Sequence, residues 1–315
     1  MQVSDPLVST PQTKVLTGVF PVLPTPFDRD GQVDEAGLRR LVRYLLHCGV
    51  DGMTYPGVAS EVGQLTETER LRMTSAVLDE VAGRVPVIVG TSSGDAKTTV
   101  RLALDAVARG AAALMVAVPP DRPTAAAQIE YFDEVADAVP HAALMLQNVP
   151  LPVGAGLEPT AVLEVLNAVP AIRYVKEETL PSGQRLSLLR AQAPASLLGV
   201  FGGAGGRYIT DELRRGAAGT MPAIELAEVH VALFKAHRAG DTERVRALFT
   251  RMLPVLNVQA VFRWALTKHV LQRRGLLACD HQRAAGPRLD AQDRADVDAF
   301  LDDLADLLPP VRALP

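Results

Sequence analysis

A lysine and two carboxylates end a short apolar run, Ile172-Arg173-Tyr174-Val175-Lys176-Glu177-Glu178-Thr179. The run predicts a buried strand. Because strand side chains alternate between faces, Lys176 and Glu178 share one face and Glu177 lies on the other. Burial disfavours the ammonium form of a lysine, which leaves an amine able to form an imine. The alternative is that Lys176 lies at the exposed end of the strand and pairs with Glu177 or Glu178.

Three other apolar runs end in residues that could bind a substrate. They end in Gly57-Val58-Ala59-Ser60-Glu61, in Gln147-Asn148-Val149-Pro150 and in Phe201-Gly202-Gly203-Ala204-Gly205-Gly206. The glycine loop could hold an anion on its backbone N–H groups, or it could be a tight turn. For Ser60 and Glu61 the pattern favours local capping before the next helix, so we expect Glu61 to be structural.

Eight apolar runs alternate with helical patterns and must position these residues. The runs are 16–23, 50–56, 85–90, 113–118, 142–147, 172–179, 197–202 and 218–222. Asp34 is expected to cap the first helix and Gly49 to end it. The other helical patterns are 66–82, 95–109, 125–138, 158–168, 184–192 and 208–215.

This alternation predicts an α/β fold, a (β/α)₈ TIM barrel over residues 16–224, preceded by a leader at 1–15. Residues 225–315 form a C-terminal helical extension, with breaks at Gly240, Asn257 and Ala285-Gly286-Pro287. An open doubly wound sheet is the alternative, but the first strand-to-helix turn lacks the G-x-G-x-x-G pattern. In a barrel the active site lies at the C-terminal ends of the strands.

Composition excludes several classes of function. The 315 residues carry 32 Lys+Arg and 36 Asp+Glu, a net charge of −4 without a long basic run, so no nucleic-acid partner is expected. No apolar stretch reaches the length of a membrane span, and a cytoplasmic protein with a small-molecule substrate is expected. Cys48 and Cys279 have no partners at metal-ligand spacing. No metal and no cofactor are expected.

Several motifs in order resemble the dihydrodipicolinate synthase/N-acetylneuraminate lyase family of class I, Schiff-base lyases, over about residues 17–308. They are Val22-Leu23-Pro24-Thr25-Pro26-Phe27 with Asp30-Gly31, Gly49-Val50-Asp51-Gly52 with Gly57…Glu61 and Leu65-Thr66, Val85-Pro86-Val87-Ile88-Val89-Gly90, Asn148-Val149-Pro150 and Val175-Lys176-Glu177.

The resemblance implies roles for particular residues. Lys176 would form the imine, the loop Gly57, Val58, Ala59 and Ser60 would receive the carboxylate of a 2-oxo acid, and the strand end at Met221 would line the pocket. The resemblance also implies a homo-oligomer, a tetramer or a dimer.

Departures from the family pattern are equally informative. Gln147 stands where the family usually has a proton-shuttling tyrosine, and an amide has no titratable proton. Val58 and Ala59 replace a hydroxyl pair. Pro152 stands where the synthase has an arginine for its second substrate, and the tyrosine usual after strand four falls in Val118-Pro119-Pro120. Condensation of pyruvate with aspartate semialdehyde is therefore not expected.

One branch of the family fits better. The set Gln147…Pro150, Lys176-x-Glu178, Gly202-Gly203-x-Gly205-Gly206 and Arg273-Arg274-Gly275…Gly286-Pro287-x-Leu289-Asp290 is similar to the 2-keto-3-deoxyarabonate dehydratase branch. Glu178 is then the candidate base and Lys176 the imine former, with Gln147, Gly202 and Gly203 near the substrate. The hypotheses are a dehydratase of a 2-keto-3-deoxy sugar acid, a pyruvate-releasing aldolase, and a non-catalytic keto-acid sensor.

Overall fold

The computed structural model describes residues 15–311 and contains one sheet of eight parallel strands. The expected leader therefore lies, except for residue 15, outside the described residues. The strands are β1 (Gly18–Val19), β2 (Met53–Tyr55), β3 (Val87–Gly90), β4 (Ala113–Ala117), β5 (Leu144–Asn148), β6 (Ile172–Glu177), β7 (Gly199–Gly202) and β8 (Gly219–Thr220).

Helices follow the strands in the predicted alternation. They are α1 (Glu35–Cys48), α2 (Glu67–Val81), α3 (Ala96–Ala108), α4 (Ala125–Ala138), α5 (Pro159–Ala168), α6 (Ser182–Gln192), α7 (Ile209–Arg214), α8 (Ala227–Arg238), α9 (Thr242–Phe262), α10 (Trp264–Arg273) and α11 (Ala291–Asp302). Three 3₁₀ turns, η1 (Val58–Ser60), η2 (Val62–Gln64) and η3 (Ala204–Gly206), lie in the loops after β2 and β7.

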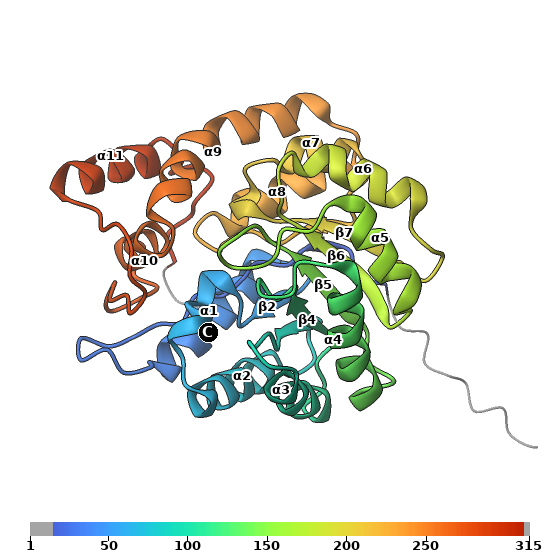
Figure 1. Ribbon diagram of the computed structural model, residues 1–315. Helices are drawn as coiled ribbons and strands as arrows, with labels where there is room; N and C mark the ends of the chain where they lie inside the picture. Colours follow the sequence, from blue (N-terminus) through green and yellow to red (C-terminus); the bar gives the residue numbers. More distant parts are fainter. Residues whose placement is uncertain (1–14, 312–315) are drawn as a thin grey trace, which may run out of the picture.

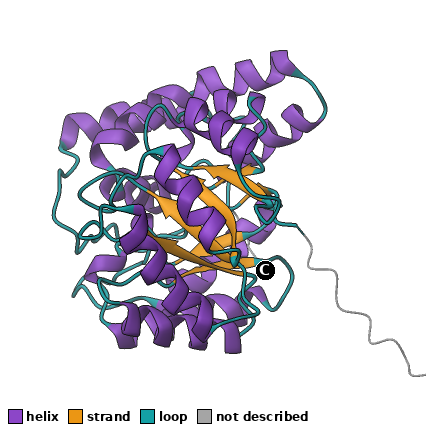
Figure 2. Ribbon diagram, turned by 45° about the vertical axis from the view of Figure 1, so that its right-hand side comes forward, coloured by secondary structure: helices purple, strands orange, loops and turns teal. Residues whose placement is uncertain are grey.

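The sheet closes into a barrel. Its strand order is β1-β8-β7-β6-β5-β4-β3-β2, so β1 and β2 are the two ends. A parallel bridge between Val22 and Thr54 joins them, and the Leu23 amide donates to the Thr54 carbonyl over 3.0 Å. Figures 1 and 2 show the helices packed around the strands. The predicted (β/α)₈ barrel is confirmed, and the open sheet is wrong.

The barrel interior is a separate apolar cluster from the layer between strands and helices. Phe20, Met115, Tyr174, Phe201 and Met221 belong to this inner cluster. The rings of Phe20 and Phe201 meet edge to face with centroids 5.5 Å apart, the arrangement that aromatic pairs prefer. Together these buried side chains occupy the barrel interior below the strand ends.

Local signals set the helix ends as the sequence predicts. The Asp34 side chain accepts a hydrogen bond from the Gly37 amide at the start of α1, and Gly49 ends the helix with φ 73°. Thr66 and Glu69 form a reciprocal capping box at the start of α2. The N-terminal caps fix the residue at which each helix begins. They therefore also fix the length of the loop that joins the helix to the preceding strand at the barrel mouth.

The C-terminal helices differ from expectation at one position. A break at Asn257 is wrong, because α9 continues through Asn257 to Phe262 and ends at Arg263, where φ is 43°. Val255, Leu256 and Gln259 are buried on one face across the expected break, and packing of that face outweighs the weak helix propensity of asparagine.

α8 packs on α1 and β1, while α9 contacts α7, α8 and η3. Figure 1 shows α9, α10 and α11 along one side of the barrel. The division of the chain at residue 224 into a barrel and a C-terminal helical region stays a prediction. α8 follows this residue directly and completes the ring of helices around the barrel.

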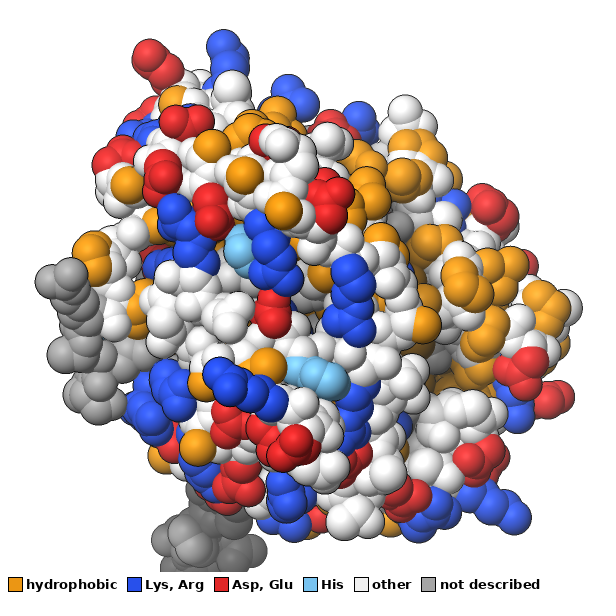
Figure 3. All heavy atoms as spheres, turned by 90° about the vertical axis from the view of Figure 1, so that its left-hand side faces the viewer, with side chains coloured by type: hydrophobic (Ala, Val, Ile, Leu, Met, Phe, Trp, Pro, Cys, Tyr) orange, Lys and Arg blue, Asp and Glu red, His pale blue; other side chains and the backbone are white. Residues whose placement is uncertain are grey.

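The face that carries the C-terminal helices has acidic and basic side chains interspersed (Figure 3). Ion pairs join residues of the C-terminal region, such as Arg273–Asp302 at 2.9 Å and Arg294–Asp280 at 2.8 Å. Among residues 15–311 no helix has both the length and the apolar content needed to cross a bilayer.

Candidate active site at the barrel mouth

Lys176 lies near the end of β6 with only 4% of its surface exposed. The strand register places it beside Gln147 of β5 and Phe201 of β7. Its Nζ atom lies 3.3 Å from Oε2 of Glu178. The idea of an exposed lysine at the strand end is therefore wrong, whereas the pairing with Glu178 on the same face is confirmed.

Glu178 is held by three groups from three strand ends. Besides Lys176, the Gln147 side-chain amide donates to Oε2 over 2.6 Å and the Ala204 backbone amide donates to Oε1 over 3.0 Å. Burial by itself would raise the pKa of Glu178, but the Lys176 ammonium and the two amides together hold it below the ordinary value. Glu178 is thus a carboxylate at neutral pH, positioned next to an amine.

The glycine loop after β7 gives Glu178 room. A Cβ atom on Gly203 would come within 2.5 Å of Oε1 of Glu178, and one on Gly202 within 1.8 Å of Glu212 Oε2. Gly205 also has a positive φ of 69°, so the loop makes a tight turn. Its Ala204 amide binds an anion as well, but that anion is the carboxylate of Glu178. Substrate contacts by Gly202 and Gly203 stay a prediction.

Glu177 points to the opposite side of β6, as strand parity predicts. Its carboxylate accepts from the Asn148 side chain at 3.0 and 3.2 Å and from the Thr179 amide at 2.8 Å, and lies 3.4 Å from Nε of Arg185. Burial raises its pKa. These partners tie β5, β6 and α6 together, so the role of Glu177 is structural.

The loop after β2 is built around Ser60. The Ser60 hydroxyl accepts from the Gly57 amide over 2.8 Å and donates to the Leu23 carbonyl, which confirms local capping. The backbone amides of Val58 and Ala59 have no acceptor among residues 15–311. Two free N–H groups on one turn can receive a carboxylate.

The C-terminal helices fix this loop from outside. Glu61 and Lys268 form an ion pair in which both side chains are fully buried, and the second Glu61 oxygen accepts from the Ala284 amide over 2.6 Å. The Trp264 indole donates to the Val58 carbonyl over 2.8 Å. Glu61 is structural, as expected. Sequence reasoning missed Lys268 because its partner lies 207 positions away.

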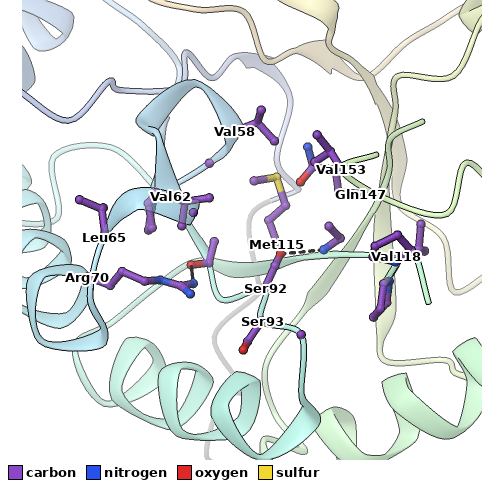
Figure 4. A pocket seen from close by; sticks show the side chains of 18 residues that line it. Val58, Val62, Leu65, Arg70, Ser92, Ser93, Met115, Val118, Gln147 and Val153 are labelled. Atoms are coloured by element: carbon purple, nitrogen blue, oxygen red, sulfur yellow. Dashed lines mark hydrogen bonds between the residues drawn. The ribbon is translucent and has the colours of Figure 1, made fainter. Parts of the chain in front are cut away.

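A cavity of about 400 Å³ opens beside these residues, at the ends of β2 to β5. Gly57, Val58 and Gln147 line it, while Lys176, Glu178 and Met221 do not. Gln147, which Figure 4 shows at the cavity, therefore links it to the Lys176–Glu178 pair through its hydrogen bond to Glu178. Met221 lies in the apolar interior below, with 2% exposure. Arg70 also lines the cavity, and sequence reasoning did not single it out.

No group of three or more His, Cys, Asp or Glu side chains within residues 15–311 is arranged to hold a metal ion. The groups that meet at this site are an amine, a carboxylate, amides and an arginine. An amine beside a carboxylate can form an imine and move a proton at the neighbouring carbon.

Known proteins are similar to this chain over most of its length. The L-2-keto-3-deoxyarabonate dehydratase of Azospirillum brasilense is 30% identical over 295 residues, which cover 92% of this chain and 94% of the relative. A 4-hydroxy-tetrahydrodipicolinate synthase of Thermus thermophilus is 35% identical over 277 residues, covering 86% of this chain and 90% of the relative.

A solved structure is also similar. It is that of YagE, a prophage protein of the dihydrodipicolinic acid synthase family from Escherichia coli K12 in complex with pyruvate. It covers 92% of this chain and 99% of its own at 27% identity, with a TM-score of 0.83. Residues 15–304 match the Dihydrodipicolinate synthetase family. The chain is therefore a lyase-type enzyme that belongs to the dihydrodipicolinate synthetase family.

Proposed function

We propose that the protein is a Schiff-base hydro-lyase that dehydrates a 2-keto-3-deoxy sugar acid, such as L-2-keto-3-deoxyarabonate. The observation that carries this proposal is the contact of Glu178 with both Lys176 and Gln147. Glu178 supplies a base next to the imine-forming amine, and Gln147 supplies a hydrogen-bond donor that cannot itself exchange a proton.

The first stage forms the imine. Lys176 must lose a proton before its nitrogen attacks the C2 carbonyl, and the carboxylate 3.3 Å away can accept that proton. The substrate carboxylate would lie on the free amides of Val58 and Ala59. Glu178 then returns this proton to the C2 hydroxyl of the carbinolamine, which leaves as water as the iminium forms, so that Glu178 is again a carboxylate. One water molecule is consumed when the product is hydrolysed from the lysine.

The second stage removes water from C3 and C4. The iminium acidifies C3, the Glu178 carboxylate takes a proton from it, and the electron pair moves to the C2–C3 bond of the enamine. The C4 hydroxyl then leaves with a proton, which the newly formed carboxylic acid of Glu178 can supply. The balance is the loss of one water molecule, and no external oxidant or reductant is needed.

A product assay over a panel of 2-keto-3-deoxy acids tests this proposal. A dehydratase converts its substrate into a 2-oxo acid with the same number of carbon atoms and releases no pyruvate. Release of pyruvate and an aldehyde in equal amounts would contradict dehydration and identify the aldolase reaction. A Lys176→Ala variant serves as the control for non-enzymatic loss of water.

A further inference from the structure

Arg70 is a buried cation that has no carboxylate partner among the described residues. It lies on α2, has 9% of its surface exposed and lines the cavity. Its one hydrogen bond is long, 3.4 Å from Nη2 to the Gly90 carbonyl, and its Nε atom has no acceptor within the described part of the chain. No carboxylate of residues 15–311 lies within ion-pair distance of it.

The acidic residues nearest to Arg70 on its own helix are already paired. Glu67 binds Arg101 at 3.0 Å and Glu69 binds Arg283 at 2.7 Å. Each carboxylate is thus engaged by another arginine. An unpaired charge is expensive to bury, commonly by several kcal/mol. The fold therefore maintains an uncompensated guanidinium, which is the group best suited to bind a carboxylate or a phosphate.

Other hydrogen-bond donors lie beside the guanidinium in the same cavity. Ser92 and Ser93 line it. The Ser92 hydroxyl oxygen accepts from the Ala117 amide over 2.8 Å, so its own proton remains free to donate. Figure 4 places Arg70 across the cavity from Gln147, with Met115 between them. One end of the cavity thus adjoins the Lys176–Glu178 pair and the other end is cationic.

We propose that Arg70 binds a second anionic group, a carboxylate or a phosphate, at the end of the substrate remote from the 2-oxo acid. This inference rests on the proposed function, since it extends the same substrate. Among 2-keto-3-deoxy acids it predicts a preference for dianionic ones over those with a neutral hydroxymethyl end, such as L-2-keto-3-deoxyarabonate. A volume of about 400 Å³ falls in the range of small-molecule sites.

Matched substrates test the inference. Three 2-keto-3-deoxy acids of equal chain length, ending in a hydroxymethyl group, a carboxylate or a phosphate ester, are compared by kcat/KM. The wild type should prefer one of the two anionic ends, and the preferred end distinguishes carboxylate from phosphate. Arg70→Met should lower the ratio of anionic to neutral kcat/KM by about 10- to 100-fold, the effect of a charge-assisted hydrogen bond. Arg70→Lys should keep part of the ratio.

Arg72→Met is the matched control, because Arg72 lies on the same helix with 53% of its side chain exposed. It should keep the wild-type ratio. A wild type that shows no preference for anionic ends, or an Arg70→Met ratio equal to that of wild type, would overturn the inference.

Two further measurements distinguish a failure of the proposed function from a failure of the proposed role of Arg70. Borohydride trapping of pyruvate, which has no second anion, tests the proposed function alone in the wild type and Arg72→Met. Loss of trapping there refutes the imine, whereas trapping without an anionic preference refutes only the role of Arg70.

Thermal unfolding with and without inorganic phosphate gives the second readout. Arg70→Met removes an unpaired buried charge, so without phosphate its Tm should equal or exceed that of wild type. Phosphate should stabilise the wild type more than Arg70→Met. A large loss of Tm on substitution would show that the guanidinium is compensated within the fold, and would overturn the inference. Stabilisation by phosphate without a substrate preference would indicate a site for free anions, and would overturn it too.

Discussion

Glu178 connects the amine of Lys176, the amide of Gln147 and the glycine loop. Glu178→Gln keeps the size of the side chain but removes the ionisable group. We expect turnover to fall by about 10²- to 10⁴-fold, the usual contribution of a general base, while the imine still forms. Steady-state turnover and borohydride trapping measure the two effects separately.

A near-wild-type turnover of Glu178→Gln would remove Glu178 from the mechanism. The proton would then have to move through a water molecule held by Gln147 or Ser60. Glu164→Gln, an exposed substitution on α5, is the control and should keep full turnover.

Gln147 and Pro152 lead to a negative prediction. Gln147 cannot shuttle a proton and Pro152 cannot pair with the carboxylate of the second substrate, so condensation of pyruvate with aspartate semialdehyde should be slow or absent. A coupled assay with both compounds measures it. Turnover at ordinary enzymatic rates, on the order of 1–10³ per second, would contradict this reading of the two positions.

Strand parity predicted the residues on β6 correctly, because a period of two fixes which face each side chain takes. Arg70 and Lys268 could not be found in the same way. Each lies on a helix, and its burial depends on how that helix packs against a strand end or a distant loop. Nothing in the neighbouring sequence distinguishes either side chain from an exposed one.

The contact between α10 and the loop after β2 holds the backbone amides that we propose as the site of the substrate carboxylate. Lys268→Met leaves Glu61 buried without its cation, which costs about 3–5 kcal/mol in comparable pairs. We expect lower stability and a raised KM for the 2-oxo acid, because the amides of Val58 and Ala59 lose their fixed position. Urea unfolding and steady-state kinetics check both.

The exposed Lys235→Met on α8 is the control for removal of a lysine. The double variant Glu61→Gln/Lys268→Met should lose less stability than the sum of its single changes, since no unpaired charge remains. A Lys268→Met enzyme with reduced stability but an unchanged KM would limit the ion pair to a structural role.

At the level of elements the sequence predicted the type and order of every strand and helix in the barrel. The signals were local, namely apolar periodicity and caps such as Asp34 and Gly49. The break at Asn257 failed because tertiary packing decided it. The contacts of α10 with the barrel mouth were also beyond sequence reasoning, since they join segments about 200 positions apart in the chain.

The stability of the whole molecule should depend on pH through Glu212. Burial raises the pKa of this carboxyl group to about 7 from 4.5, although the Ser182 hydroxyl donates to it. Between these two values the folded protein binds more protons than the unfolded chain, so this group makes stability fall as pH rises. The full effect is on the order of 3 kcal/mol.

Glu212→Gln removes that dependence. The stability of the variant relative to wild type should therefore increase between about pH 5 and pH 8, as measured by urea unfolding. Glu164→Gln, with an exposed side chain, should differ from wild type in stability by the same amount at both pH values. A constant difference for Glu212→Gln would mean that its carboxyl group titrates normally in the folded protein.

Composition and charge limited the classes of function and of partner that the protein can have, but they did not determine its oligomeric state. A homo-oligomer, tetramer or dimer, stays a prediction. The substrate also lies beyond sequence reasoning, because the cavity is lined by side chains from several loops whose meeting depends on the closed barrel.

The central claim is covalent chemistry at Lys176, and one measurement tests it most directly. The enzyme is incubated with pyruvate, reduced with borohydride and mapped by peptide mass spectrometry. Our account predicts a single modified peptide that contains Lys176, and none in Lys176→Ala. Modification at Lys97 or Lys268 in place of Lys176, or no modification at all, would contradict it.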